Sequence, residues 1–252
     1  MTLSILLPVR NEGINLRIML KILRAVMDEP HEVIVIHDTA DDDSVPVVEE
    51  IRKGYPELRL VFNQIGPGAA NAIRAGVEAA TGDVCLLFAA DEVGPVLAIE
   101  DLMTLIREGC DFVSCTRYAH GGRRLGGSLV GGILSRSANA LFRRLCRFPF
   151  TDATTGLKMF RREAFLRLPL EGTSAGWAVA FEMAIKAQLA GLRLGEVPIV
   201  SIDRLYGGKS TFRVGPWVRS YSRWFLWGFR RSFSPEARAN RAIRLRIPVS
   251  MR

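Results

Sequence analysis

Long apolar runs and paired cysteines are both missing from this sequence, and each absence excludes a class of protein. No apolar run among its 252 residues reaches the roughly 18 residues that a membrane-spanning helix needs. The four cysteines are Cys85, Cys110, Cys115 and Cys146, and they form neither a CxxC pair nor a spacing typical of a metal site. We therefore expect no spanning helix, no zinc site and reduced core cysteines, as in a cytosolic protein.

Signal peptides, internal repeats and low-complexity linkers are lacking as well. The chain enters a strand pattern at Leu3 instead of the basic and apolar segments of a secretory signal. Apolar residues make up 48% of the chain, which is enough to build a core. We expect one domain over residues 1–212 and a basic C-terminal extension over residues 213–252.

Charge is distributed unevenly along the chain. Residues 1–111 hold 9 Lys or Arg against 19 Asp or Glu, whereas residues 112–252 hold 25 against 7. Most single charges belong to a solvated surface. The segregation nevertheless indicates two kinds of ligand contact, one in each half.

Short apolar runs alternate with helical patterns through the first half of the chain. Strands are expected at residues 4–8, 32–36, 58–62, 84–90 and 112–115, and later at 196–200, where Pro198 favours a sheet edge. Helices are expected at residues 12–26, 44–51, 69–80, 97–107, 178–190 and 215–231. This alternation predicts an α/β fold with a mostly parallel mixed sheet.

Polar residues stand where the expected strands end. Asp38 follows the second strand and Asp91 the fourth, with Glu92 beside it, while Arg117 follows the fifth. Ligands of open α/β sheets bind outside the carboxyl ends of the strands, so these side chains are candidates for a binding site. Asp43 is expected instead to cap the helix at 44–51.

The glycine-rich segment Gly66-Pro-Gly-Ala-Ala-Asn71 does not indicate a nicotinamide enzyme. It lacks the third glycine of the dinucleotide fingerprint, follows the third strand instead of the first, and has no acid about 20 residues later at a strand end.

Several motifs in order resemble family 2 glycosyltransferases, over roughly residues 3–228. They are Leu7-Pro-Val-Arg-Asn-Glu12, Val33-Ile-Val-Ile-His-Asp38, residues 66–76, Ala80-Thr-Gly-Asp83 and Ala89-Ala-Asp91. Downstream, Thr116-Arg-Tyr118, Leu134-Ser-Arg136, Thr151-Asp-Ala-Thr-Thr-Gly156, Asp203-Arg204 and Gly208-Lys-Ser210 resemble the polyprenyl-phosphate branch of dolichol-phosphate mannose synthases. No single motif is decisive, but their order and spacing together are specific.

The resemblance implies a nucleotide-sugar (GT-A-like) fold, an inverting glycosyltransferase activity, and a set of site residues. The nucleotide sugar would contact Pro8, Arg10, Glu12, Asp38, Asp91 and Arg117. Asp152 would lie at the sugar as an orienting group or base, and it would form the catalytic set with Arg117 and Asp91. Ser135, Arg204, Ser210 and Arg123 would bind the acceptor or its phosphate.

One departure from the family pattern concerns the metal. Ala89-Ala90-Asp91 stands where the family usually has Asp-x-Asp, so one carboxylate is missing. Mg²⁺ is often bound by one or two carboxylates plus substrate phosphates, so Asp91 alone is a weak but workable ligand for Mg²⁺ or Mn²⁺.

The expected acceptor is a dolichyl or undecaprenyl phosphate and the expected sugar is mannose or glucose. A phosphate monoester is already anionic near neutral pH, so the reaction needs no strong base, and arginine suits its phosphates. The helical spacing of an aromatic stripe points to an interfacial helix, and the stripe consists of Trp217, Tyr221, Trp224, Phe225 and Gly228. We expect peripheral binding to the cytoplasmic face of the cell membrane, with room for a membrane-anchoring partner subunit, unless the stripe packs on the domain.

Three alternatives compete with this interpretation. A nucleotide-sugar-binding accessory protein would bind the donor without turnover, because of Ala89. A soluble acceptor would replace the lipid in a related glycosyltransferase. A nucleic-acid-binding protein would use the basic half, but aromatic residues do not interleave with the central arginines, so we expect no nucleic acid partner.

Overall fold

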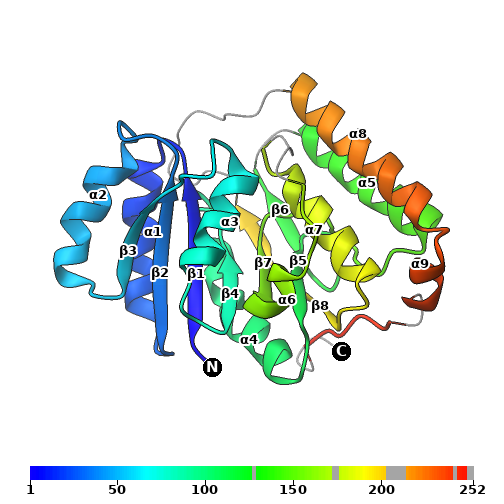
Figure 1. The fold of residues 1–252 in the computed structure, drawn as a ribbon, viewed down its shortest axis with the longest axis horizontal. Coiled ribbons are helices and arrows are strands. Elements are labelled where there is room, and N and C mark those ends of the chain that lie inside the picture. Colours follow the sequence, from blue (N-terminus) through cyan, green and yellow to red (C-terminus); the bar gives the residue numbers. More distant parts are fainter. Residues whose placement is uncertain (127–128, 172–175, 203–213, 241–242, 249–252) are drawn as a thin grey trace.

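A central β-sheet is built from the strand segments that alternate with helices in the sequence (Figure 1). This computed structural model describes residues 1–126, 129–171, 176–202, 214–240 and 243–248. In that part of the chain, seven strands form one sheet in the order β3-β2-β1-β4-β7-β5-β8, and β6 pairs with β9 in a second sheet. The strands are β1 (Leu3–Val9), β2 (His31–His37), β3 (Leu58–Phe62), β4 (Val84–Leu87), β5 (Phe112–Thr116), β6 (Arg123–Leu125), β7 (Lys158–Arg161), β8 (Leu194–Pro198) and β9 (Val200–Ile202).

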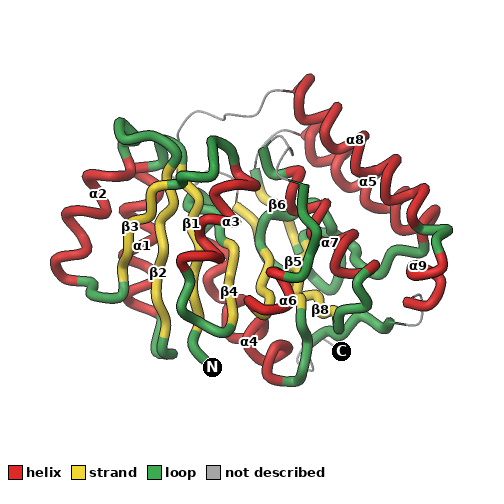
Figure 2. Tube along the Cα trace, viewed as in Figure 1, coloured by secondary structure: helices red, strands yellow, loops and turns green. Residues whose placement is uncertain are grey.

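Helices cover both faces of the sheet, as Figure 2 shows. They are α1 (Gly13–Val26), α2 (Ser44–Ile51), α3 (Ala69–Ala79), α4 (Ile99–Arg107), α5 (Leu129–Cys146), α6 (Arg162–Leu166), α7 (Ala178–Leu189), α8 (Val214–Arg231) and α9 (Pro235–Ala239). Two 3-10 turns, η1 (Arg52–Gly54) and η2 (Gly94–Ala98), precede β3 and α4.

Alternation along β1 explains the two core layers. Ile5 and Leu7 pack in a cluster with the apolar residues of α1, α2 and α4, whereas Leu6 packs in a second cluster with α3 and α7. Successive side chains of a strand point to opposite faces, so a strand that is apolar at every position is buried on both sides. The α/β fold with a mostly parallel sheet is therefore as the sequence predicts.

Strand directions decide which residues share an edge. β1 pairs in parallel with β2 and β4, and β5 pairs in parallel with β8. β7 runs antiparallel to both β4 and β5, between which it lies. Because β4 and β5 flank the same antiparallel strand, they run in the same direction as each other.

The predicted elements differ from the observed ones in a few places. The fourth strand ends at Leu87, three residues earlier than expected, and a turn leads to Asp91. β8 lies at the end of the strand order, which confirms the edge predicted from Pro198. Helix α5 and strand β7 were not expected from the sequence. All four cysteines are buried without disulfides, and burial raises the pKa of Cys110 to about 11.

Helix α8 packs on the domain, and this corrects the expected role of its aromatic stripe. Trp224 is only 1% exposed, and Tyr221 and Phe225 are half-buried against the second core cluster. A Cβ on Gly228 would lie 2.7 Å from the Phe142 ring, so the glycine permits close contact between α8 and α5. The prediction that this stripe faces a membrane is wrong for these four residues. The side chain of Trp217 and the boundary at 212/213 lie outside the described residues.

Candidate functional site

The site residues meet at one edge of the seven-stranded sheet. The segments after β1, β2, β4 and β5 leave the sheet at this edge because these strands run in the same direction. The loop 151–157 enters the antiparallel β7 and so reaches the same edge from the opposite direction. The strand order reverses between β1 and β4, which is where open α/β sheets bind ligands.

Asp38 joins the end of β2 to the glycine-rich loop before α3. Its Oδ1 accepts a hydrogen bond from Asn63 Nδ2 at 2.8 Å, and its Oδ2 accepts one from the Gly68 N–H at 2.8 Å. Gly68 has a φ of +116°, a conformation that side-chain-bearing residues rarely adopt. The half-buried carboxylate is therefore held at the sheet edge by backbone that needs glycine.

Glu12 lies at the start of α1, where the loop after β2 closes the helix terminus. The Gly13 N–H donates to Asp43 Oδ1 at 2.8 Å, and Glu12 Oε2 accepts a hydrogen bond from Asn15 at 2.8 Å. Asp43 makes no side-chain bond to α2, so the prediction that it caps that helix is wrong: it serves α1 instead. Glu12 is half-buried, as is Pro8, whereas Arg10 is exposed.

Asp91 follows β4 in a turn and is half-buried. Its neighbour Glu92 accepts a hydrogen bond from Ser201 at 3.1 Å, which directs that carboxylate towards β9. Within the described ranges, no three His, Cys, Asp or Glu side chains form a group that could hold a metal ion. A divalent ion at this edge would therefore have to take most of its ligands from a substrate diphosphate, with Asp91 as the candidate protein ligand.

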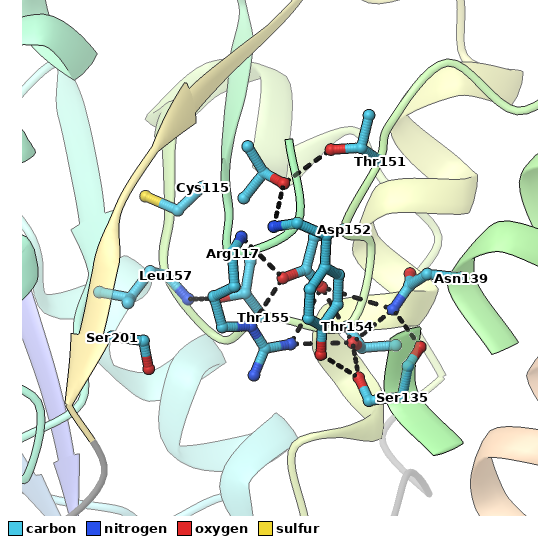
Figure 3. A network of polar contacts seen from close by, with 12 residues as sticks. Cys115, Arg117, Ser135, Asn139, Thr151, Asp152, Thr154, Thr155, Leu157 and Ser201 are labelled. Carbon is cyan, nitrogen blue, oxygen red and sulfur yellow. Dashed lines mark hydrogen bonds and ion pairs between the residues drawn. The ribbon is translucent and has the colours of Figure 1, made fainter. Parts of the chain in front are cut away.

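Arg117 and Asp152 form the strongest polar contact at this edge (Figure 3). The Arg117 Nε and Nη2 donate to Asp152 Oδ2 and Oδ1 at 2.6 and 3.0 Å, and the Arg117 N–H also donates to Oδ2 at 3.2 Å. Such a two-pronged pair is both strong and geometrically specific. The Tyr118 ring covers one face of the guanidinium, and Nη1 makes no hydrogen bond with the described residues. The side chain is 14% exposed, so Nη1 is the nitrogen that a ligand could still engage.

The protonation state of this pair follows from its surroundings. Asp152 is fully buried, and burial alone would raise its pKa, but the charge and hydrogen bonds of Arg117 outweigh burial and lower it. The same carboxylate raises the pKa of Arg117 against the effect of burial. Asp152 is therefore an ionised, fully engaged carboxylate, which suits an orienting group better than a proton acceptor.

Helix α5 supplies the other polar groups around Asp152. Asn139 Nδ2 donates to Thr154 Oγ1 at 3.0 Å, and Thr154 Oγ1 donates to Asp152 Oδ1 at 3.0 Å. The Ser135 hydroxyl accepts a hydrogen bond from the Tyr118 hydroxyl at 2.9 Å and lies 3.1 Å from Thr154 Oγ1. Arg117, Asp152 and Ser135, which the sequence predicts as separate motifs, are thus brought together in one network (Figure 3).

Two buried charges in this network were missed from the sequence. Glu196 accepts hydrogen bonds from the Thr151 N–H at 2.8 Å, from its hydroxyl at 2.7 Å, and from the Asp152 N–H at 3.3 Å. Burial raises the pKa of Glu196 to about 7. Lys158 donates to Ser114 Oγ at 2.9 Å, and burial lowers its pKa to about 8. In the sequence, the only signal is a charged residue next to apolar ones: Glu196 lies inside β8, and Lys158 begins β7.

The remaining predicted residues lie apart from this network or outside the described chain. Arg123 is exposed on β6, where it pairs with Val200 through the backbone. Arg204 and Ser210 fall within residues 203–213, outside the described residues.

Comparison with known proteins identifies the family of this chain. The model of the family "Glycosyl transferase family 2" matches residues 4–168. Glycosyltransferase AglD of Haloferax volcanii is 28% identical over 202 residues, which are 78% of this chain and 32% of AglD. The dolichol-phosphate mannosyltransferase of Pyrococcus furiosus is 25% identical over 237 residues, 90% of this chain and 64% of that protein. This chain thus spans between about a third and two thirds of these relatives.

Comparison with solved structures identifies the fold. Glucosyl-3-phosphoglycerate synthase of Mycobacterium tuberculosis, in complex with Mn²⁺, uridine diphosphate and glucosyl-3-phosphoglycerate, superposes with a TM-score of 0.69 at 20% identity. The match covers 90% of this chain and 79% of that one. The same synthase has also been solved with Mg²⁺ and uridine diphosphate. The family match and the fold together show that this chain belongs to glycosyl transferase family 2 and has a GT-A fold.

Proposed function

We propose that this chain is an inverting glycosyltransferase that moves a hexose, mannose or glucose, from a nucleotide-diphosphate sugar to a polyprenyl phosphate. The observation that carries the proposal is the shared sheet edge. It has carboxylates after β1, β2 and β4 and the Arg117–Asp152 pair beside them after β5. Hydroxyls and base edges of a nucleoside suit the carboxylates, and phosphates suit the arginine.

On the donor side, Glu12 and Asp38 would contact the nucleoside, with Pro8 and Arg10 lining the same strand end. Asp91 would hold a divalent ion on the diphosphate, and that ion would supply charge neutralisation for the departing diphosphate. The complexes of the synthase with Mn²⁺ or Mg²⁺ and uridine diphosphate support a divalent ion at a GT-A site in general.

At the reacting centre, an acceptor phosphate oxygen would attack the anomeric carbon from the face opposite the diphosphate. The new C–O bond would form as the bond to the diphosphate breaks, so the anomeric configuration would invert. A phosphate monoester with a second pKa of about 6 is already a nucleophilic anion and needs no base. Asp152 would therefore orient Arg117, whose open Nη1 would bind phosphate, while Ser135 would donate its hydroxyl to the acceptor.

The lipid acceptor draws support from two observations. The Pyrococcus relative is called a dolichol-phosphate mannosyltransferase. Exposed apolar and arginine side chains also gather on α5, the helix that carries Ser135. The solved synthase favours a soluble alternative, because its complexes contain phosphoglyceric acid. Peripheral binding at the cytoplasmic membrane face and a membrane-anchoring partner subunit belong to the lipid version of the proposal.

Transfer of radiolabelled sugar tests the proposal. GDP-mannose, UDP-glucose and other labelled nucleotide sugars are incubated with polyprenyl phosphate, with phosphoglyceric acid as a soluble comparison, and with Mg²⁺, Mn²⁺ or EDTA. We expect label in the organic phase, lost in EDTA and reduced at least 100-fold by Arg117→Lys, because lysine cannot pair bidentately with Asp152. Label only in the aqueous phase would favour the soluble acceptor. Donor binding without transfer would favour the accessory protein, and Ala89→Asp would then create metal-dependent activity.

A further inference from the structure

Helix α5 exposes a row of large apolar side chains that no described element covers. Val130, Ile133, Leu134, Leu141 and Leu145 are between 46% and 67% exposed. Surface helices normally turn their apolar residues towards the core, and large exposed apolar patches mark interaction sites. The outer face of α5, defined by these five residues, therefore needs a partner.

The opposite face of the same helix belongs to the candidate site. Asn139 and Phe142 are buried, and Ser135 and Asn139 contribute to the network around Asp152. The two faces are separated only by the width of a helix, roughly 10 Å. Whatever binds the outer face of α5 thus lies close to where an acceptor phosphate would react.

Charge indicates the chemistry of the partner. Arg136, Arg143, Arg144 and Arg147 are exposed and make no ion pair with the described residues, and residues 117–151 contain no acid. A helix that combines exposed leucines with several arginines and no acids is typical of helices that lie on anionic lipid.

A small pocket adds a second observation on this helix. Arg136 and Arg143 are seven residues apart and so lie on the same face of α5. They line a cavity of about 140 Å³ together with Tyr118, Ala140 and Thr151. A water molecule occupies about 30 Å³ of liquid, so this volume accommodates a phosphate group. Thr151 is also one of the groups that Glu196 holds beside Asp152.

Helix α8 continues the surface. It lies beside α5 in Figure 1, and the two are joined by the Phe142–Phe225 ring contact. The outward positions of α8 expose Leu226 at 55%, with Arg230 nearby. Within the described ranges, no helix is long and apolar enough to cross a bilayer, so the helices would lie along its surface.

We infer that the outer face of α5 docks on an anionic lipid bilayer, with the Arg136–Arg143 pocket holding a lipid headgroup phosphate. This inference rests on the proposed lipid acceptor and specifies the surface by which the enzyme reaches it. It replaces the aromatic stripe of α8, which packs on the domain, as the membrane-facing feature.

Vesicle sedimentation tests the docking surface. The full chain is mixed with phosphatidylcholine vesicles with or without phosphatidylglycerol, near physiological salt. We expect binding to the anionic vesicles only, weakened at least tenfold by Leu141→Glu with Arg143→Glu. The matched control is Leu166→Glu with Arg167→Glu at the C-terminal end of α6, where the leucine is 52% exposed against 50% for Leu141. This control is expected to bind like the wild type.

Several outcomes would overturn the inference. One is that the wild-type protein does not bind anionic vesicles. Another is that the α5 and α6 variants lose vesicle binding to the same extent. A dimer in solution that the α5 variant abolishes, without vesicle binding, would assign the face to a second copy. Transfer to a detergent-solubilised polyprenyl phosphate is measured in parallel. Vesicle binding without any transfer would contradict the proposed acceptor but support the docking surface. Transfer without vesicle binding would support the proposed acceptor and contradict the docking surface.

Discussion

At the scale of single residues, Glu196 is a carboxylate whose charge works against folding. Burial raises its pKa to about 7, so the folded chain holds a proton that the unfolded chain releases near pH 4.5. Its contribution to stability is full below about pH 4.5 and is lost as the pH rises through 7. We expect Glu196→Gln, which mimics the protonated form, to gain about 2 kcal/mol relative to wild type between pH 5 and 7.5.

Urea denaturation of both proteins at pH 5 and 7.5 measures this change. Groups that titrate equally in the two proteins contribute nothing to the difference in stability between them. Lys158, whose pKa is lowered to about 8, remains mainly charged across this pH range. A stability difference that is the same at both pH values would mean that Glu196 is already ionised at pH 5. Glu196→Ala is the companion variant, and it should be less stable at both pH values because the Thr151 and Asp152 N–H groups lose their acceptor.

For single residues, the sequence indicates the position of side chains that follow a strand and misses charged side chains that belong to a strand. Asp38, Asp91 and Arg117 stand directly after apolar runs, so strand direction alone places them at the ligand edge. Glu196 lies inside β8 and Lys158 begins β7, and a charged residue in a strand ordinarily marks the solvent face. Only tertiary contacts show that both are buried, those of Glu196 with Thr151 and of Lys158 with Ser114.

At the scale of elements, Gly228 determines how closely α8 packs. A Cβ there would lie 2.7 Å from Phe142 and 2.9 Å from Ile185, both in the core. Alanine is favoured over glycine in a helix by about 1 kcal/mol, but forcing a methyl into a packed core costs about 1–3 kcal/mol. We therefore expect Gly228→Ala to lower the free energy of unfolding by about 1 kcal/mol, measured by urea denaturation.

Gly132→Ala on α5 is the matched control. There the new methyl would meet only the end of the flexible Arg124 side chain, at 3.2 Å. Helix propensity should then dominate, and the variant should be as stable as the wild type or more so. Stabilisation by both substitutions would mean that α8 is not packed closely at Gly228.

The elements that the sequence predicted well are those whose apolar residues face the core. α2 matches its expected bounds, Ser44–Ile51, and β5 extends the expected strand by one residue to Thr116, because apolar residues of both are buried. α5 was missed because its large apolar residues point outwards while polar residues such as Ser135 and Asn139 face the site. In α8 the same period was recognised, but Gly228 was read as part of a membrane-facing stripe when it marks a helix–helix contact.

At the scale of the whole molecule, the charge asymmetry along the chain coincides with two sets of contacts. The acidic half, residues 1–111, supplies β1 to β4 with Glu12, Asp38 and Asp91 at their ends. The basic half supplies Arg117 and the outer face of α5. Both halves contribute strands to one sheet, in which β7 joins β4 to β5. Donor and lipid would therefore be bound mainly by different halves of the chain, which meet at one edge of the sheet.

Donor binding and membrane binding should then be separable by mutation. Asp38→Asn removes a charged acceptor at the proposed nucleoside contact, and hydrogen bonds to charged groups are worth about 1.5–3 kcal/mol. We expect its affinity for the nucleoside diphosphate of the active donor, measured by calorimetry, to fall at least tenfold, while binding to anionic vesicles stays at the wild-type level. The reverse pattern is expected for Leu141→Glu with Arg143→Glu. Asp41→Asn is the control, because Asp41 is exposed in the same loop and makes no side-chain contact with the described residues. If the Asp38 variant alone lost both donor binding and vesicle binding, the donor and the lipid would share one site. That result would rule out the separate donor and lipid sites that the charge distribution indicates.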